Sequence, residues 1–235
     1  MQTGTYPGGE LELFAAAENW KTYVKSQLSP YLQGNVLEVG AGIGSTTGYL
    51  CGPGKGRWVC LEPDPEMAER LSRAASSGGL PARCEAVKGT IADIPPGALF
   101  DAVIYIDVLE HIEDDAAELR AAAAMLSGGG RLIVLAPAHQ FLYTAFDRGV
   151  GHFRRYSLGD LARIAPPGLE ALRLDYLDSA GLLASLGNRL LLRSGMPTAG
   201  QIRFWDSFLV RISRRLDPLL AHRLGKSALA VWRRP

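Results

Sequence analysis

The first 137 residues alternate short apolar runs with amphipathic segments. The most apolar of these runs, Phe100–Ile106, is typical of a central strand that is buried on both faces of a sheet. Strands that alternate with helices indicate a parallel sheet with helices on both of its faces. The runs that we expect to form strands are Val36–Val39, Arg57–Leu61, Ala82–Val87, Phe100–Ile106 and Arg131–Ala136.

The segments between these runs have helical spacing. Between Glu10 and Leu32 the apolar residues recur at steps of three and four, and Pro30 marks the end of the predicted helix. Asp64 is expected to cap the next long helix, because an aspartate at this position accepts hydrogen bonds from the first free N–H groups. The other expected helices and turn are Ser45–Leu50, Pro65–Ala75, Asp114–Leu126 and a turn at Gly128-Gly129-Gly130.

The pattern changes beyond Pro137. The segment Ala138–Tyr156 is aromatic and polar without clean periodicity, and Ser179–His222 predicts two amphipathic helices separated by Gly195–Gly200. In the second helix we expect Ile202, Trp205, Phe208 or Leu209, Ile212 and Leu216 on one face, with Arg203, Arg211, Arg214 and Arg215 elsewhere. A short helix at Leu158–Ile164 and strands at Leu169–Tyr176 and Ser227–Trp232 complete the prediction.

Composition excludes several classes of protein. The chain has 235 residues and a formal net charge of +1, which gives no support to nucleic-acid binding. Three single cysteines, Cys51, Cys60 and Cys84, have no metal-ligand spacing and cannot all pair, which favours a reduced, cytoplasmic protein. No signal-peptide pattern is present, Met1–Gly9 is expected to be a loose arm, and the apolar run Leu182–Leu192 is too short to span a bilayer.

A glycine-rich loop follows the first predicted strand and leads into a helix. Such a loop lets a ligand lie against bare backbone at the carboxyl end of a sheet. A dinucleotide fingerprint places glycine at its first, third and sixth positions, whereas this loop has Gly40, Gly42 and Gly44, with Ser45 in the sixth position. Glu38, just before the loop, is poorly placed for a phosphate but suits a cationic ligand.

Three further markers stand at the ends of the next strands. Glu62 can accept both hydroxyls of a ribose, Thr90 and Ile91 can flank a flat base, and Asp107 ends the fourth strand. Together with Glu38-Val39-Gly40-Ala41-Gly42-Ile43-Gly44 and Phe100–His111, these markers resemble a class I S-adenosylmethionine-dependent methyltransferase over roughly residues 30–137. Pro137-Ala138-His139-Gln140 and Gly151-His152-Phe153-Arg154-Arg155-Tyr156 resemble a bacterial subgroup of that family.

The resemblance implies a fold, a cofactor and a division of the chain. The fold is a Rossmann-like, doubly wound α/β sheet of seven strands, the last one antiparallel, with a helical insertion between strands six and seven. A single methyltransferase domain is then divided into an N-terminal helix (10–33), a cofactor-binding core (34–137), a substrate-side loop with helix and strand six (138–178), an insertion or lid (179–222) and a final strand (223–235). The implied cofactor is S-adenosylmethionine, and the implied contacts are Glu38, Gly40, Ala41, Gly42, Gly44, Glu62, Pro63, Thr90, Ile91, Asp107 and Val108. Asp107 has an equally physical alternative role as a helix cap.

Two histidines are candidate catalytic bases, because imidazole titrates near neutral pH. By analogy with the family, His111 lies near the sulfonium, although packing beside the cofactor is an equally physical role. His152 stands in the aperiodic loop, away from any buried periodic face, and is expected to contact or deprotonate the acceptor.

The acceptor side is less defined by the sequence. Arg154 and Arg155 suit a phosphate or carboxylate, or they brace the loop against Asp147 or Asp160. The remaining acceptor candidates are His139, Tyr143 and Tyr156, and an aromatic wall that also includes Phe146 and Phe153 is indistinguishable from ordinary packing. No metal is expected, because no cluster has ligand spacing. Membrane contact through the arginine-rich helix is possible but not favoured over packing on the sheet.

These observations favour methyl transfer from S-adenosylmethionine to a small-molecule acceptor, a natural product, a sugar or a lipid-linked intermediate, with oxygen narrowly preferred to nitrogen or carbon. A non-catalytic S-adenosylmethionine-binding module and, less favoured, an NAD-dependent oxidoreductase remain as alternatives. The near-neutral charge argues against a methyltransferase that acts on nucleic acid, and we see no appended recognition domain for nucleic acid or protein. The sequence leaves the oligomeric state open.

Overall fold

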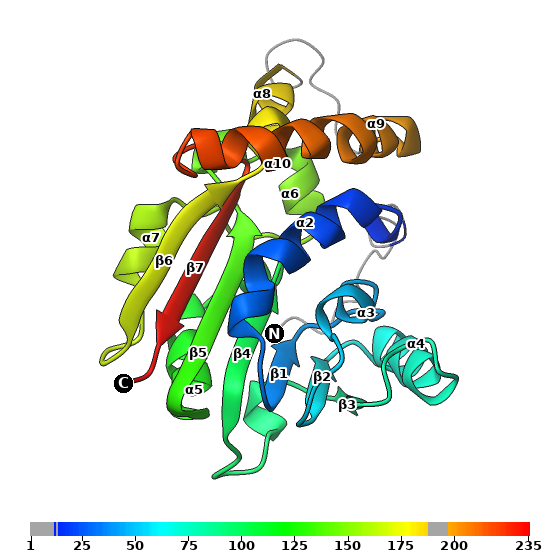
Figure 1. The fold of residues 1–235 in the computed structure, drawn as a ribbon, viewed down its shortest axis with the longest axis vertical. Coiled ribbons are helices and arrows are strands. Elements are labelled where there is room, and N and C mark those ends of the chain that lie inside the picture. The colour runs from blue at the N-terminus through cyan, green and yellow to red at the C-terminus, as the bar shows by residue number, and fades with distance from the viewer. Residues whose placement is uncertain (1–11, 13, 188–196) are drawn as a thin grey trace.

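The computed structural model describes residues 12, 14–187 and 197–235. The expected N-terminal arm Met1–Gly9, the start of the first predicted helix and residues 188–196 of the insertion lie outside the described residues. Seven strands form one sheet in the order β3-β2-β1-β4-β5-β7-β6 (Figure 1). The strands are β1 (Val36–Val39), β2 (Trp58–Glu62), β3 (Cys84–Lys88), β4 (Phe100–Ile106), β5 (Leu126–Pro137), β6 (Glu170–Leu177) and β7 (Ser227–Arg233).

The sheet topology confirms the predicted fold. Strands β1 to β5 pair in parallel, while β7 pairs antiparallel with both β5 and β6. The central strand β4 lies between β1 and β5, and most of its side chains are fully buried, as its apolar sequence predicts. The carboxyl ends of β1 and β4 therefore lie side by side, and the loops that follow them meet at one edge of the sheet.

Helices cover both faces of this sheet (Figure 1). Asp64 caps α4 as predicted, because its carboxylate accepts from the N–H groups of Glu66 and Met67, both at 3.0 Å. The helices before the insertion are α2 (Glu18–Leu28), α3 (Thr47–Leu50), α4 (Pro65–Ser76), α5 (Asp115–Ala124), α6 (Ala145–Gly149) and α7 (Leu158–Arg163).

One predicted turn is wrong. The glycines Gly128-Gly129-Gly130 lie inside β5, which begins at Leu126. Leu126 pairs with Phe100, and the register shifts between Phe100 and Ala102. The glycines thus form an irregular stretch of the strand.

The insertion contains α8 (Ser179–Gly187), α9 (Ala199–Phe204), a π-helical turn at Trp205–Leu209 and α10 (Val210–Leu219). The described part of α9, the π turn and α10 forms one continuous rod across the end of the sheet (Figure 1). The face predicted for this rod is correct up to the π turn and wrong beyond it. Val210, Ser213 and Asp217 are buried there, whereas Leu216 is 37% exposed. A π turn holds an extra residue, and this extra residue rotates all later side chains about the helix axis.

Buried carboxylates tie the insertion to the rest of the fold. Asp217 accepts from the N–H of Asp178 at 2.7 Å and from the hydroxyl of Tyr23 on α2, also at 2.7 Å. Asp206 accepts from the N–H of Trp20 at 2.8 Å. The insertion and α2 are therefore held together over the carboxyl edge of the sheet, where they enclose the space described next.

Candidate active site

The loop after β1 has the backbone geometry that its glycines predict. Gly40, Gly42 and Gly44 all have positive φ angles, of 70°, 57° and 80°. A Cβ atom on Gly40 would lie 2.5 Å from a methyl group of Val108, whereas a Cβ atom on Gly42 would project into open space. Gly42 therefore presents bare backbone to a ligand, and Gly40 allows the loop to pack against the end of β4.

Two buried glutamates support this loop. Glu62 accepts from the N–H of Gly42 at 2.8 Å and from the N–H of Asp64 at 2.9 Å, which fixes its carboxylate beside the loop. Burial raises the pKa of the Glu62 carboxyl above its usual range. Glu38 accepts from the indole N–H of Trp58 at 2.7 Å, and burial raises the pKa of its carboxyl to about 7. A cationic ligand near Glu38 would favour the ionised carboxylate.

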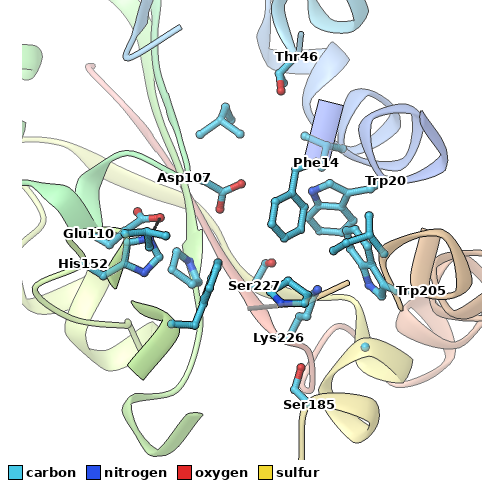
Figure 2. Close-up of a pocket in the computed structure, with 18 of the residues that line it drawn as sticks. Phe14, Trp20, Thr46, Asp107, Glu110, His152, Ser185, Trp205, Lys226 and Ser227 are labelled. Atoms are coloured by element: carbon cyan, nitrogen blue, oxygen red, sulfur yellow. Dashed lines mark ion pairs between the residues drawn. The ribbon is translucent and has the colours of Figure 1, made fainter. Parts of the chain in front are cut away.

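A cavity of about 770 Å³ lies between the sheet edge, α2 and the insertion (Figure 2). Pockets of roughly 300–1,000 Å³ hold small-molecule ligands, so this one has room for a nucleoside cofactor and a small acceptor. Among the described residues, the predicted cofactor contacts in its lining are Glu38, Gly40, Ala41, Gly42 and Asp107. The other predicted cofactor contacts lie outside the lining: Gly44, Glu62, Pro63, Thr90, Ile91 and Val108.

Asp107 lies near the middle of the cavity, between the two groups of side chains that line it (Figure 2). Its φ angle is +53°, and its N–H donates to Leu135 at 2.8 Å, which turns the chain sharply at the end of β4. Burial raises the pKa of its carboxyl to about 6, although the nearby basic side chains, with His152 foremost, act in the opposite direction. Asp107 is not the cap of α5, because Asp114 accepts from the N–H of Ala117 at that position.

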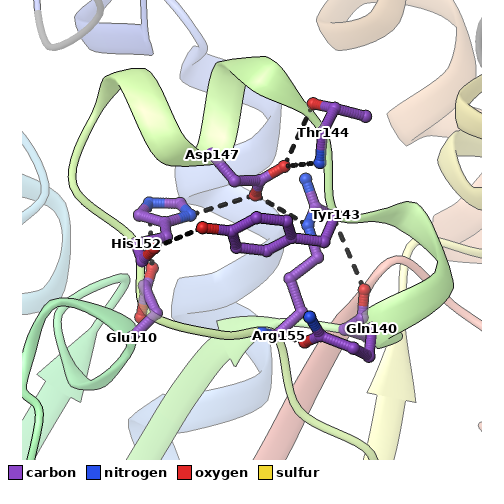
Figure 3. A network of polar contacts seen from close by, with 8 residues as sticks. Glu110, Gln140, Tyr143, Thr144, Asp147, His152 and Arg155 are labelled. Carbon is purple, nitrogen blue, oxygen red and sulfur yellow. Dashed lines mark hydrogen bonds and ion pairs between the residues drawn. The ribbon is translucent and has the colours of Figure 1, made fainter.

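His152 lines the cavity and is held by a buried network (Figure 3). Its Nδ1 lies 3.0 Å from Oδ1 of Asp147, and the same oxygen accepts from Nε of Arg155 at 2.7 Å. Asp147 is fully buried, and its other oxygen accepts from the N–H of Thr144 at 2.8 Å. The bonds from His152 and Arg155 hold the pKa of the Asp147 carboxyl well below its usual range, despite the opposing effect of its burial.

Glu110 and His111 lie beside His152. Nε2 of His152 is 3.8 Å from Oε1 of Glu110, which is too long for a hydrogen bond. Neither carboxyl oxygen of Glu110 has a hydrogen-bond partner among the described residues, and burial raises the pKa of this carboxyl well above its usual range. Burial and the neighbouring His152 lower the pKa of His111 to about 4, so that His111 is neutral at pH 7.

The same side chains form a cluster that sequence spacing did not reveal. Glu110, His111 and His152 offer one donor atom each, and these atoms lie within 4.8 Å of one another. Carboxylate and imidazole are ligands for divalent transition metals. Our expectation of no metal site considered only the spacing of ligand residues along the sequence. It did not reveal this cluster, whose members the fold brings together.

Four predicted acceptor residues have other partners. The hydroxyl of Tyr143 donates to the backbone oxygen of His152 at 2.6 Å, and Arg154 donates to Asp115 at 2.7 Å. Tyr156 is 1% exposed and donates to Asp115 at 2.8 Å. His139 lies 2.9 Å from the backbone oxygen of Gly225, and none of the four is in the cavity lining. Of the other residues predicted for the acceptor side, Phe146, His152 and Arg155 line the cavity.

Sequence reasoning missed several residues that line the cavity. Lys21 and Trp20 come from α2, which was expected only to pack beside the sheet, and Lys226 precedes β7. Nζ of Lys226 lies 3.7 Å from the ring centroid of Trp205 and 3.6 Å from Asp178. Burial lowers the pKa of both lysines. No local motif marks them, although Thr144-x-x-Asp147 is a capping-box pattern that does point to a buried carboxylate near His152.

Comparisons with known proteins agree with this geometry. A family model described as "Methyltransferase domain" matches residues 37–134. A ubiquinone biosynthesis O-methyltransferase from Xanthomonas axonopodis pv. citri is 30% identical over 71% of this chain and 65% of its own length. The chain spans 38% to 65% of the length of five of the curated relatives that it matches.

Solved structures with the same fold include enzymes of different chemistry. The N-methyltransferase NodS from Bradyrhizobium japonicum WM9, in complex with S-adenosyl-L-homocysteine, has a TM-score of 0.59 at 18% identity and covers 98% of both chains. The [4+2]-cyclase SpnF has a TM-score of 0.62 at 17% identity, covering 92% of this chain and 81% of its own. These likenesses show the fold, while the family match covers the strands and loops that carry the glycine motif. Residues 37–134 therefore match a methyltransferase domain, and the comparisons support S-adenosylmethionine as the cofactor.

Proposed function

We propose that the chain transfers the methyl group of S-adenosylmethionine to a hydroxyl oxygen of a small-molecule acceptor, with His152 as the base. The observation that carries this proposal is that His152, which is paired with the buried Asp147, lines the same cavity as the Gly40–Gly42 loop. The glycine loop would hold the cofactor, which supplies an electrophilic methyl group on a cationic sulfur. Glu38 and Asp107 give that side of the cavity the carboxylates that suit a cation.

His152 is oriented for proton transfer. When its Nδ1–H donates to Asp147, its Nε2 carries a free lone pair directed toward Glu110. The acceptor hydroxyl gives its proton to Nε2 while its oxygen forms a bond to the methyl carbon. The carbon–sulfur bond breaks at the same time, and its electrons remain on sulfur, which leaves a methyl ether and S-adenosylhomocysteine. Asp147 stabilises the imidazolium that forms, and Arg155 fixes Asp147.

The lining of the cavity supports an aromatic or otherwise apolar acceptor. Phe14, Trp20, Trp205 and Leu209 contribute apolar surface on the side of α2 and the insertion. The relatives named for ubiquinone biosynthesis O-methylation support an aromatic hydroxyl compound as the first acceptor to test. The likeness to the N-methyltransferase NodS keeps amines in the same panel.

The test is a methyl-transfer assay with a panel of phenols, alcohols, sugars and amines, in which S-adenosylhomocysteine and the methylated product are both measured by mass spectrometry. We expect His152→Ala to lower turnover by roughly 10²–10⁴-fold, the usual contribution of a general base, with cofactor affinity unchanged. His222→Ala is the matched control, because His222 lies at the end of α10, outside the cavity lining. Wild-type turnover in His152→Ala would refute the assigned base. Loss of activity with a chelator would instead assign His152 to a metal site with Glu110 and His111.

A second candidate is a module that binds the cofactor without methyl transfer, and the fold is compatible with it, since a protein named as a [4+2]-cyclase has the same fold. It predicts cofactor binding by calorimetry with no methylated product from any member of the panel. The less favoured NAD-dependent oxidoreductase predicts thermal stabilisation by NAD and none by S-adenosylmethionine. The three outcomes are distinguishable with the same protein preparation.

A further inference from the structure

The outer face of the rod formed by α9, the π turn and α10 is apolar where a packed helix would be polar. Phe204 and Phe208 are 58% and 55% exposed and stack on each other with a centroid distance of 5.6 Å. Farther along the rod Leu216, Leu219 and Leu220 are exposed as well, with Leu219 exposed to 81%. Large apolar side chains gathered on one exposed helical face mark an interaction surface.

The π turn produces this surface. On the inner side of the rod, Trp205, Val210 and Asp217 are buried against α2 and the end of the sheet. Without the extra residue in the turn, the sequence pattern would direct Leu216 inward together with Trp205. In the described fold Val210 and Asp217 occupy the inner face instead, and Leu216 is left exposed on the outer side.

The charges around this apolar surface have one sign. Five arginines between residues 199 and 224 are exposed: Arg203, Arg211, Arg214, Arg215 and Arg223. The only acidic residues of that segment, Asp206 and Asp217, are buried and paired internally. The outer face of this segment thus combines exposed apolar side chains with exposed arginines and has no exposed acid.

We propose that this face docks on an anionic lipid surface. The phenylalanines and leucines would enter the boundary between headgroups and acyl chains, and the arginines would bind the anionic headgroups. No helix among the described residues is long and apolar enough to cross a membrane, so the contact is with the surface of the bilayer. The net charge of the whole chain is only +1, so the attraction comes from the local concentration of arginines.

Two features favour a bilayer over a second copy of the chain. Face-to-face pairing of two such rods would oppose two sets of arginines without an exposed acid of the same segment to neutralise them. The surface is also continuous with the cavity, because Phe204 is exposed on the rod and also lines the cavity. Docking would bring the cavity next to the headgroup region of the membrane, where an amphiphilic acceptor would lie. The docking itself does not rest on the proposed function, since it is measured without turnover.

The test is co-sedimentation of the full chain with vesicles of phosphatidylcholine, with and without phosphatidylglycerol. We expect binding to the anionic vesicles only, and weaker binding as salt is raised, because salt screens the headgroup charge. Phe208→Ser with Leu219→Ser, and separately Arg214→Glu with Arg215→Glu, are each expected to lower the bound fraction by at least about tenfold.

The matched control is Leu99→Ser with Leu172→Ser, which removes two apolar side chains that are 51% and 43% exposed elsewhere on the molecule. Thermal unfolding checks that all variants are folded, and all of the substituted side chains are at the surface. Equal binding of the rod variants and the control would overturn the proposal, as would equal binding to neutral vesicles. A concentration-dependent dimer that Phe208→Ser with Leu219→Ser dissociates, without vesicle binding, would assign the face to self-association and overturn it as well.

Discussion

The strongest single test of the acceptor side is Asp147→Asn, which keeps the shape of the side chain and removes its charge. Asp147 is fully buried and accepts two hydrogen bonds from basic side chains, at 3.0 Å from Nδ1 of His152 and at 2.7 Å from Nε of Arg155. It also caps α6 by accepting from Thr144. An asparagine that keeps the cap through its oxygen places its amide donor where Oδ1 of Asp147 accepted from both basic partners.

The expected loss of stability follows from these bonds. A hydrogen bond to a charged group contributes about 1.5–3 kcal/mol, and the asparagine loses two such bonds, so we expect a loss of about 3–6 kcal/mol. Because the pKa of Asp147 is lowered in the folded protein, its contribution is complete above the unfolded value of about 3.9. The difference between wild type and variant should therefore be constant above about pH 5 and should shrink as the pH falls below about 4.

The control for this experiment is Asp160→Asn. Asp160 caps α7 by the same capping box, with bonds of 2.9 Å and 2.7 Å from Ser157, but its only basic partner in the described part of the chain is the exposed Arg163. Urea unfolding should show a loss of about 0.5–2 kcal/mol for Asp160→Asn, the usual value of a helix cap. In the methyl-transfer assay only Asp147→Asn should lose turnover, and neither variant should change cofactor affinity. Equal effects of the two substitutions on stability and turnover would refute the view that Asp147 acts through His152.

Three further predictions concern the cofactor side and the insertion. Gly42→Arg should abolish S-adenosylmethionine binding in calorimetry because it fills the cavity, whereas Gly78→Arg, which is also at a positive φ and also faces open space, should not. Burial raises the pKa of Glu38 to about 7, above its value in the unfolded chain. The cofactor-free protein should therefore lose about 3 kcal/mol of stability relative to Glu38→Gln as the pH rises from about 4.5 to 7. A constant difference in stability across that range would contradict the burial argument. Asp217→Ala should cost about 3–5 kcal/mol in urea unfolding, because it leaves the N–H of Asp178 and the hydroxyl of Tyr23 buried without an acceptor; a loss below about 1 kcal/mol would contradict the anchoring of the insertion by this carboxylate.

The parts of the fold that the sequence predicts well are those with local causes. Strand β4 is almost entirely buried and Asp64 caps α4, and both follow from residues within a few positions. The glycine loop is predictable for the same reason, since Gly40 and Gly42 need positive φ angles at a fixed distance from a strand. Hydrophobic period, cap chemistry and backbone freedom are properties of short segments.

The parts that the sequence does not predict depend on contacts between distant segments. Tyr156 and Arg154 are residue types that suit acceptor binding, but both donate hydrogen bonds to Asp115, which is about forty positions away in the chain. Lys21 lines the cavity from α2, which is joined to the distant insertion through Asp206 and Asp217. The π turn is likewise missed, because a single extra residue leaves the composition of the helix unchanged while it rotates every side chain beyond it.

The pKa shifts in the cavity have one dominant cause, which bears on the kind of reaction that the site favours. Burial is the largest contribution for the acids Glu38, Asp107 and Glu110 and also for the bases Lys21 and Lys226, and in each case it opposes the charged form. An enclosed site that disfavours charge speeds a reaction in which charge disappears. In the proposed transfer the positive charge leaves the sulfonium and appears on the imidazole of His152, where the buried carboxylate of Asp147 is paired with it. No unpaired charge then remains in the site, which is why the base has to line the cavity and lie beside a buried acid.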